Sequence, residues 1–95
     1  MLVLRKMVGS KLEYYDISSE EDIINLVGEN FRATPFLTND IIILYDKNGK
    51  VNNHPINFHY ENEPFFGDVL FSKHIDNDLI ALSNSDINTI FKYFK

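Results

Sequence analysis

The chain has 95 residues, of which 44% are hydrophobic and 14% aromatic, which excludes an intrinsically disordered protein and predicts a single domain over residues 1–95. It carries 14 acidic against 9 basic residues, a net charge of −5, and the lysines and arginines are scattered along the chain. Because no basic stripe is present to neutralise phosphates, the composition disfavours direct binding of nucleic acid.

The absence of cysteine excludes a disulfide framework and a cysteine-ligated metal site. No apolar run approaches the roughly 20 residues that a membrane span requires, and the charge order at the start does not fit a signal peptide. We therefore expect a cytoplasmic protein that does not contact a membrane.

The chain begins with signals for a hairpin and a helix. Residues 2–4 and 11–17 flank a Gly-Ser pair, which predicts a hairpin or an opening strand with a kink. The segment Ser18–Glu21 has the spacing of a capping box, in which Glu21 bonds back to the cap, and it predicts a helix over Ser19–Gly28. The expected buried stripe of this helix is Ile23, Ile24 and Val27.

Two strands follow. Asn30–Leu37 contains Pro35, which has no amide donor, so this strand is expected at an edge of the sheet or with a bulge. Asp40–Asp46 includes four consecutive branched aliphatic residues, which predict a strand buried on both faces at the centre of the sheet. Asn48-Gly49 then predicts a turn in which Gly49 takes a positive φ.

The second half predicts two more strands and a terminal helix. Ile56–Glu63 fits a short helix and an extended stretch equally, whereas Val69–Ile75 and Leu79–Leu82 have the composition of strands. A capping box starting at Ser83 predicts a helix over Asn84–Phe94. Its expected buried face is Ile87, Ile90, Phe91 and Phe94.

These elements predict an α+β fold. We expect a small, antiparallel-leaning sheet that carries two short helices on one face, the second of them C-terminal.

No residue pattern specifies a reaction. His59, Glu61 and Glu63 alternate, so an extended segment would place all three on one face, where they could bind a metal or exchange protons; a solvated polar face explains the same pattern. The glycines are isolated, which excludes a phosphate-binding loop, and no serine has the context of a nucleophile. We expect a protein that is not an enzyme and needs no cofactor or metal.

The candidate binding residues lie between positions 52 and 68. Phe65 and Phe66 are adjacent, so in a strand they point to opposite faces: either one marks a contact surface, or both are buried where the chain bends. The full candidate set is Asn52, Asn53, His54, Asn57, His59, Tyr60, Glu61, Glu63, Phe66 and Asp68.

Four short segments occur in an order that resembles a known family. They are residues 46–50, 54–57, 66–71 and 80–86. Their order is similar to that of a family described only as a domain of unknown function, common in phages, plasmids and integrative elements. The resemblance covers Asn30 to Phe94, and His54 departs from it by standing where an aliphatic residue is usual. It implies a mobile-element protein, a setting in which small acidic proteins often interfere with host defence.

Three functional hypotheses follow, in this order of preference. The first is an inhibitor that binds a basic surface of a host protein, such as a defence nuclease or another nucleic-acid-binding effector. The second is an oligomeric protein that sequesters a nucleotide signal around Asn52, Asn53, Asn57, Tyr60 and Phe66. The third is a metal-dependent enzyme built on the alternating His and Glu residues. A homodimer is also open, because a chain this short buries only about 60–65% of its unfolded surface.

Overall fold

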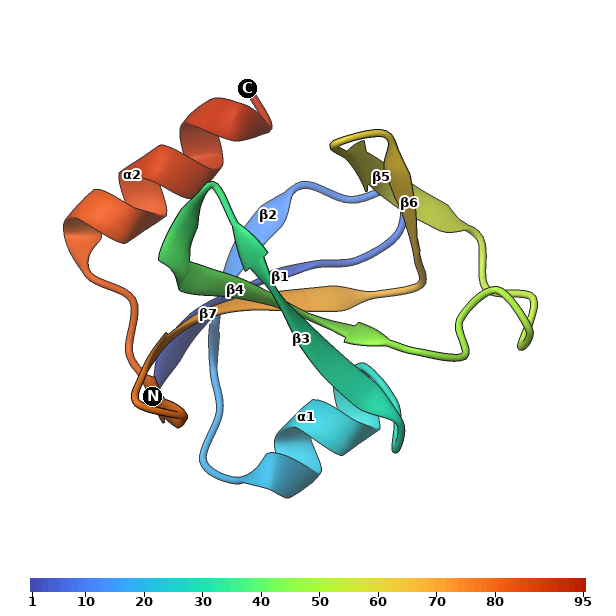
Figure 1. The fold of residues 1–95 in the computed structure, drawn as a ribbon, viewed down its shortest axis with the longest axis horizontal. Helices are drawn as coiled ribbons and strands as arrows, with labels where there is room; N and C mark the ends of the chain where they lie inside the picture. The colour runs from blue at the N-terminus through green and yellow to red at the C-terminus, as the bar shows by residue number, and fades with distance from the viewer.

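A computed structural model describes residues 1–95 (Figure 1). Its elements are β1 (Leu2–Lys6), β2 (Leu12–Asp16), α1 (Glu20–Leu26), β3 (Phe31–Phe36), β4 (Thr38–Asp46), β5 (Ile56–Tyr60), β6 (Glu63–Phe66), β7 (Val69–Ile75), β8 (Asp78–Ile80) and α2 (Asn84–Tyr93). The predicted α+β class is confirmed. Neither helix has the length and apolarity needed to cross a membrane.

One antiparallel sheet holds six of the strands. Its order is β2-β1-β7-β4-β3, and β8 pairs with the distal part of β7. The remaining strands, β5 and β6, form a separate two-stranded hairpin. The centre of the sheet is therefore β7, and the prediction that Asp40–Asp46 forms the central strand is wrong by one position, because β4 has only the edge strand β3 beyond it.

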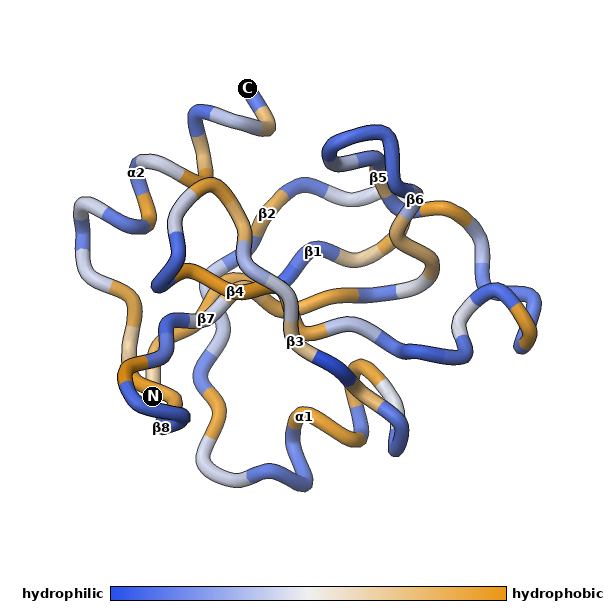
Figure 2. The backbone as a smooth tube through the Cα atoms, viewed as in Figure 1, coloured by the Kyte–Doolittle hydropathy of each residue, from blue (hydrophilic) through white to orange (hydrophobic).

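The two faces of the sheet carry separate cores. On β4, Ile41 and Ile43 belong to the core beneath α2, whereas Ile42 and Leu44 belong to the core against α1, and all four are buried as predicted. The prediction that both helices lie on one face is wrong: Figure 1 shows α1 and α2 on opposite sides of the sheet. The hydrophobic stretches of β4 and β7 in Figure 2 run between the two helices.

The predicted N-terminal hairpin is present, and α1 begins close to its expected start. The helix cap differs from the prediction, because Ser19 occupies the N-cap without a side-chain bond. The amide and hydroxyl of Ser18 instead donate to Asp22 Oδ2 at 2.7 and 3.0 Å. These bonds lower the pKa of the Asp22 carboxyl, and Glu21 has no part in the cap. Of the expected stripe, Ile23 and Val27 are buried and Ile24 is half-buried.

Strand β3 confirms the prediction made from Pro35, of an edge strand or a bulge, and both features are present. It is the edge strand of the sheet, and its register with β4 shifts between Pro35 and Phe36. Leu37 then reverses the chain with a φ of 66°, so β4 begins directly at Thr38.

The turn after β4 forms, but Gly49 does not have a positive φ, so that prediction is wrong. The Asx interaction is present: Asn48 N donates to Asp46 Oδ1 at 2.9 Å. Glycine avoids crowding at position 49, since a Cβ there would lie 3.0 Å from both Cβ and the carbonyl oxygen of Phe66, a distance tighter than usual for such contacts. The positive φ in this loop belongs to Asn53, at 60°.

The ambiguous segment 56–63 is extended, but it bends before its end. Glu61 and Asn62 have φ values of 52° and 66° and join β5 to β6 as a two-residue hairpin loop. Positive φ at both central residues is the geometry of a type I′ turn, which matches the twist of the flanking strands.

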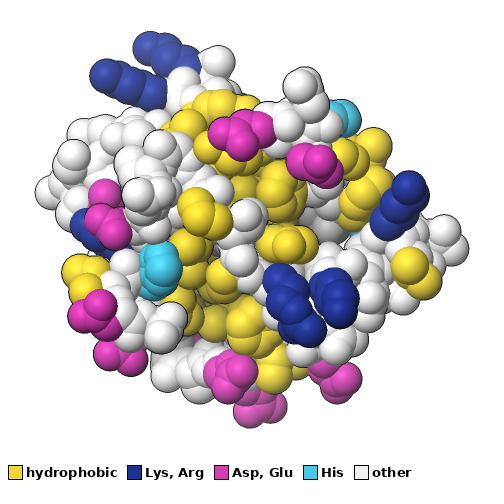
Figure 3. Space-filling model, viewed as in Figure 1, with side chains coloured by type: hydrophobic (Ala, Val, Ile, Leu, Met, Phe, Trp, Pro, Cys, Tyr) yellow, Lys and Arg dark blue, Asp and Glu magenta, His cyan; other side chains and the backbone are white.

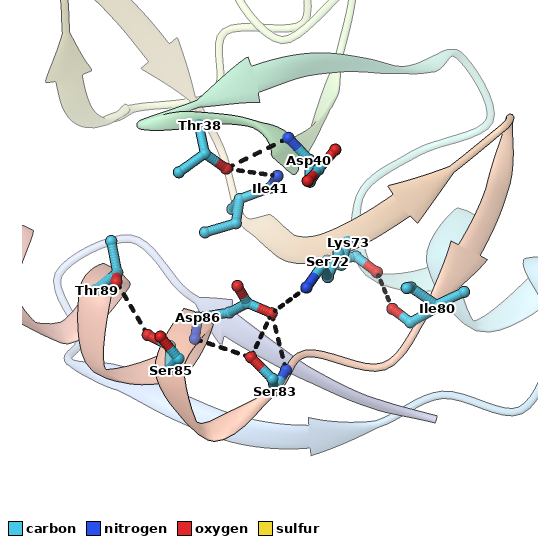
Figure 4. Close-up of polar contacts among 10 residues, drawn as sticks. All are labelled: Thr38, Asp40, Ile41, Ser72, Lys73, Ile80, Ser83, Ser85, Asp86 and Thr89. Carbon is cyan, nitrogen blue, oxygen red and sulfur yellow. Dashed lines mark hydrogen bonds and ion pairs between the residues drawn. The ribbon is translucent and has the colours of Figure 1, made fainter.

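Helix α2 begins with the predicted capping box between Ser83 and Asp86 (Figure 4). Ile87 and Ile90 are buried as expected, and Phe94 packs on the core. Phe91 is 37% exposed, so the prediction that it is a core residue is wrong.

Candidate functional site

The ten predicted binding residues do not form one site. Asn52, Asn53 and His54 lie in the loop after β4, and the others lie on β5 and β6, in the turn that joins them, and just before β7. Three of them hold the fold together instead of facing a ligand.

Asn57 is fixed by three internal hydrogen bonds. Its Nδ2 donates to the carbonyl oxygens of Lys6 and Gly67 at 2.7 and 2.9 Å, and its Oδ1 accepts from Lys6 Nζ at 2.8 Å. The side chain thus joins the β5–β6 hairpin to β1 and leaves little capacity for a ligand.

Asp68 and Tyr60 secure turns. Asp68 Oδ1 accepts from the amide of Val8 at 2.8 Å, and Tyr60 Oη accepts from the amide of Leu37 at 2.9 Å. The ring of Tyr60 also packs on Phe36, with 4.6 Å between centroids. Both residues satisfy backbone groups that secondary structure leaves unpaired.

His59, Glu61 and Glu63 do not share a strand face, because the turn at 61–62 separates β5 from β6. No group of three or more His, Asp or Glu side chains is placed to hold a metal ion. Glu63 instead lines a hollow of about 390 Å³ with Phe66.

His54 approaches a carboxylate. Its Nε2 lies 3.7 Å from Oδ2 of Asp46, whose side chain is only 8% exposed. The pair opens into a hollow of about 220 Å³ that Asp68 also lines. An Asp–His pair orients an imidazole for proton transfer, but nucleophilic catalysis needs a third group. The lining holds no hydroxyl, thiol or amine: it consists of Val8, Leu26, Val27, Asp46, His54, Pro55, Gly67 and Asp68.

An apolar hollow lies where α1, β3 and β8 meet. Its volume is about 370 Å³, and five of its eight lining residues are hydrophobic. The lining is Met1, Ile17, Ser18, Ser19, Glu20, Ile23, Phe31 and Leu79. These residues come from four separate parts of the chain, so no sequence window could reveal the hollow.

Three acidic residues either line this hollow or directly precede a lining residue in the sequence. Glu20 lines it, Asp16 directly precedes Ile17, and Asp78 directly precedes Leu79; all three acidic residues are exposed. Asp16 Oδ1 accepts from the amino group of Met1 at 2.6 Å, so its charge is partly balanced. Figure 3 shows acidic side chains along the lower and left borders of this side of the molecule, with hydrophobic side chains between them.

A model of the family described as a domain of unknown function, DUF3846, matches residues 1–95. The chain belongs to this family. The match extends to β1, β2 and α1, which the resemblance in sequence order did not include. No curated protein and no solved structure matches the chain. The family description names no activity, so the function of this DUF3846 chain must be argued from its surface.

Proposed function

We propose that this DUF3846 protein is a non-enzymatic binding protein that docks on a basic surface of another protein and inhibits it by covering that surface. The observation that carries the proposal is the apolar hollow between α1 and β8, with exposed carboxylates beside it. We call Glu20, Asp78 and the lining residues of this hollow the docking surface.

The two parts of the docking surface have different physical roles. A hollow lined by Ile17, Ile23 and Phe31 excludes water around an inserted apolar side chain, and such anchors supply most of the binding energy of an interface. Exposed carboxylates contribute little at equilibrium, but they steer a basic partner during the encounter. Salt screens that attraction over a Debye length of about 8 Å at physiological ionic strength.

A basic surface with an apolar side chain at its centre is the complementary partner. Proteins that bind nucleic acid have basic surfaces, because lysines and arginines must neutralise phosphates. An acidic protein of net charge −5 seated there would exclude the nucleic acid. A defence nuclease of a host cell is the partner that we propose, in line with the mobile-element setting that the sequence resemblance implies.

The proposal can be tested with a defined probe. An arginine-rich peptide with one central Phe, and a second peptide with Ser in its place, represent the basic surface with and without its anchor. We expect the Phe peptide to bind the wild-type chain and the Ser peptide to bind at least about tenfold more weakly, as expected for loss of a large buried side chain.

The matched variants are Glu20→Lys with Asp78→Lys, and Glu61→Lys with Glu63→Lys as the control of equal charge change. The first pair should slow association of the Phe peptide several-fold and flatten its salt dependence, while the control keeps most of the rate. Equal rates for the two double variants would refute the docking surface. A loss confined to the control would move docking to the β5–β6 hairpin, which the sequence pattern of Glu61 and Glu63 favours.

A further inference from the structure

Another hollow, of about 480 Å³, lies between the β1–β2 turn and the end of α2. Its volume is within the range of roughly 300–1,000 Å³ that small-molecule sites occupy. Three of its seven lining residues are lysines and two are phenylalanines. The complete lining is Lys6, Ser10, Lys11, Leu12, Phe91, Phe94 and Lys95.

The lysines of this hollow have no carboxylate partner. The four ion pairs of the protein join Met1 to Asp16, Arg5 to Glu13, His54 to Asp46, and Lys73 to Asp86. Acidic residues outnumber basic ones by 14 to 9 in the chain, and yet three lysines line this hollow without an ion-pair partner. Such a concentration of positive charge attracts an anion.

Lys6 retains a free donor. Its Nζ donates to the carbonyl oxygen of Ser10 at 3.1 Å and to Asn57 Oδ1 at 2.8 Å. An ammonium group has three N–H donors, so one remains for a ligand. Burial lowers the pKa of the Lys6 amine, and an anion beside it would favour the charged form. The bonds to Ser10 and Asn57 fix the position of this donor.

Aromatic rings lie beside the charges. Phe91 is 37% exposed, and Lys6 Nζ is 5.8 Å from the centroid of the Phe94 ring. Tyr14, which is 63% exposed, extends the aromatic surface, with its centroid 6.1 Å from that of Phe91. The hollow adjoins the C-terminal end of α2. A helix C-terminus has a partial negative charge of about one half of an elementary charge, which the positive charges of three lysines outweigh.

From this geometry we infer that the hollow binds a small ligand with both a planar aromatic ring and an anionic group, which is the chemistry of a mononucleotide. The ring stacks on Phe91, and the phosphate accepts from Lys6 and Lys11. The site goes beyond the proposed function and shares no residue with the docking surface. It also differs from the nucleotide site considered from the sequence around Asn57 and Tyr60, since those side chains are committed to internal bonds.

The test measures binding of adenosine monophosphate to the whole chain by calorimetry, with adenosine and inorganic phosphate as separate probes. We expect the nucleotide to bind at least about tenfold more tightly than either part, because charge-assisted bonds and stacking each add affinity. Phosphate binding as tight as the nucleotide would refute the role of the rings, and no nucleotide binding at millimolar concentration would refute the site.

The variants separate this site from general charge effects. Lys11→Gln with Lys95→Gln should weaken nucleotide binding by about tenfold or more, whereas the control Lys47→Gln with Lys50→Gln, which removes the same charge elsewhere, should leave it unchanged. Phe91→Leu should weaken the nucleotide but not phosphate. Equal losses in the two double variants would overturn the inference. Glu20→Lys with Asp78→Lys should not weaken nucleotide binding, so this site and the docking surface can fail independently.

Discussion

Ile90 and Phe91 are neighbours on α2, but their surroundings differ. Ile90 is completely buried in the core of the α2 layer, whereas Phe91 is partly exposed and faces Tyr14 of β2. Both fall on the apolar stripe that helical spacing predicts, and this stripe is wider than the part of the helix that the sheet covers. Which member of the stripe is exposed depends on where the β1–β2 hairpin ends, and periodicity within the helix does not contain that information.

This difference predicts unequal costs of truncation. Ile90→Ala should lower the free energy of unfolding by about 2–5 kcal/mol, the range for emptying a fully buried aliphatic site. Phe91→Ala should cost about 1 kcal/mol, because its ring is already partly in water. Urea denaturation followed by circular dichroism measures both. A larger loss for Phe91 than for Ile90 would contradict the burial described for α2.

At Gly49, too, one feature could be predicted from the sequence and another could not. The Asx turn could be predicted, because the bond from the Asn48 amide to Asp46 is local. The reason for the glycine could not, since it is the close approach of Phe66, which lies on another hairpin. Local hydrogen-bond chemistry is readable from the sequence, whereas contacts between distant segments are not.

At the scale of elements, the start of α2 is joined to the sheet through one carboxylate. Asp86 Oδ2 accepts from the amide and hydroxyl of Ser83 at 2.9 and 2.8 Å and from Lys73 Nζ of β7 at 3.0 Å (Figure 4). Burial raises the pKa of the Asp86 carboxyl, but the bonds from Ser83 and the charge of Lys73 outweigh it, so the pKa lies below its ordinary value.

The pH dependence of stability follows from this lowered pKa. A carboxyl whose pKa is lower in the folded chain stabilises the fold above its unfolded pKa, near 3.8, and loses that contribution as the pH falls through the folded value. Asp86→Asn should therefore cost about 1 kcal/mol at pH 7, typical of a lost helix cap, and much less at a pH below the folded pKa. Urea midpoints for both proteins at neutral and strongly acidic pH make the comparison. An equal difference at both pH values would show that the charge of Asp86 is not what stabilises α2.

Most elements could be predicted, and the β5–β6 hairpin shows why one could not. Its turn residues, Glu61 and Asn62, both have positive φ without a glycine. Such a conformation is uncommon for Glu, so sequence chemistry gives no turn signal there. Packing in the core compensates: Phe58 of β5 stacks on Phe65 of β6, with 5.1 Å between the ring centroids.

For the whole molecule, the sheet is shared by two cores. The run Ile41–Leu44 predicted burial on both faces, and a strand buried on both faces needs a layer on each side. The expectation of two helices on one face was inconsistent with this burial, which requires one helix on each side of the sheet. The docking surface and the basic hollow were unpredictable for a different reason, since each is assembled from segments far apart in the chain.

A shared sheet predicts cooperative unfolding. Ile42→Ala empties the α1 side and Ile43→Ala the α2 side of one strand, and each should cost about 2–5 kcal/mol. Each variant should still unfold in one transition, because neither core persists without the strands that both use. Far-ultraviolet circular dichroism and tyrosine fluorescence should give coincident curves. Separate midpoints in either variant would mean that the two layers unfold independently.

The position of Pro35 on β3 has a consequence for how these molecules meet in concentrated solution. An unpaired sheet edge is a template for another chain, and stacking through such edges leads to fibrillar aggregates. Pro35 offers no N–H, and the register shift beside it interrupts the edge. The opposite edge, β2, carries the charged residues Glu13 and Asp16. Addition of a strand from a second copy is therefore hindered at the β2 and β3 edges, which leaves β8, the β5–β6 hairpin and the faces of the molecule as routes to a homodimer.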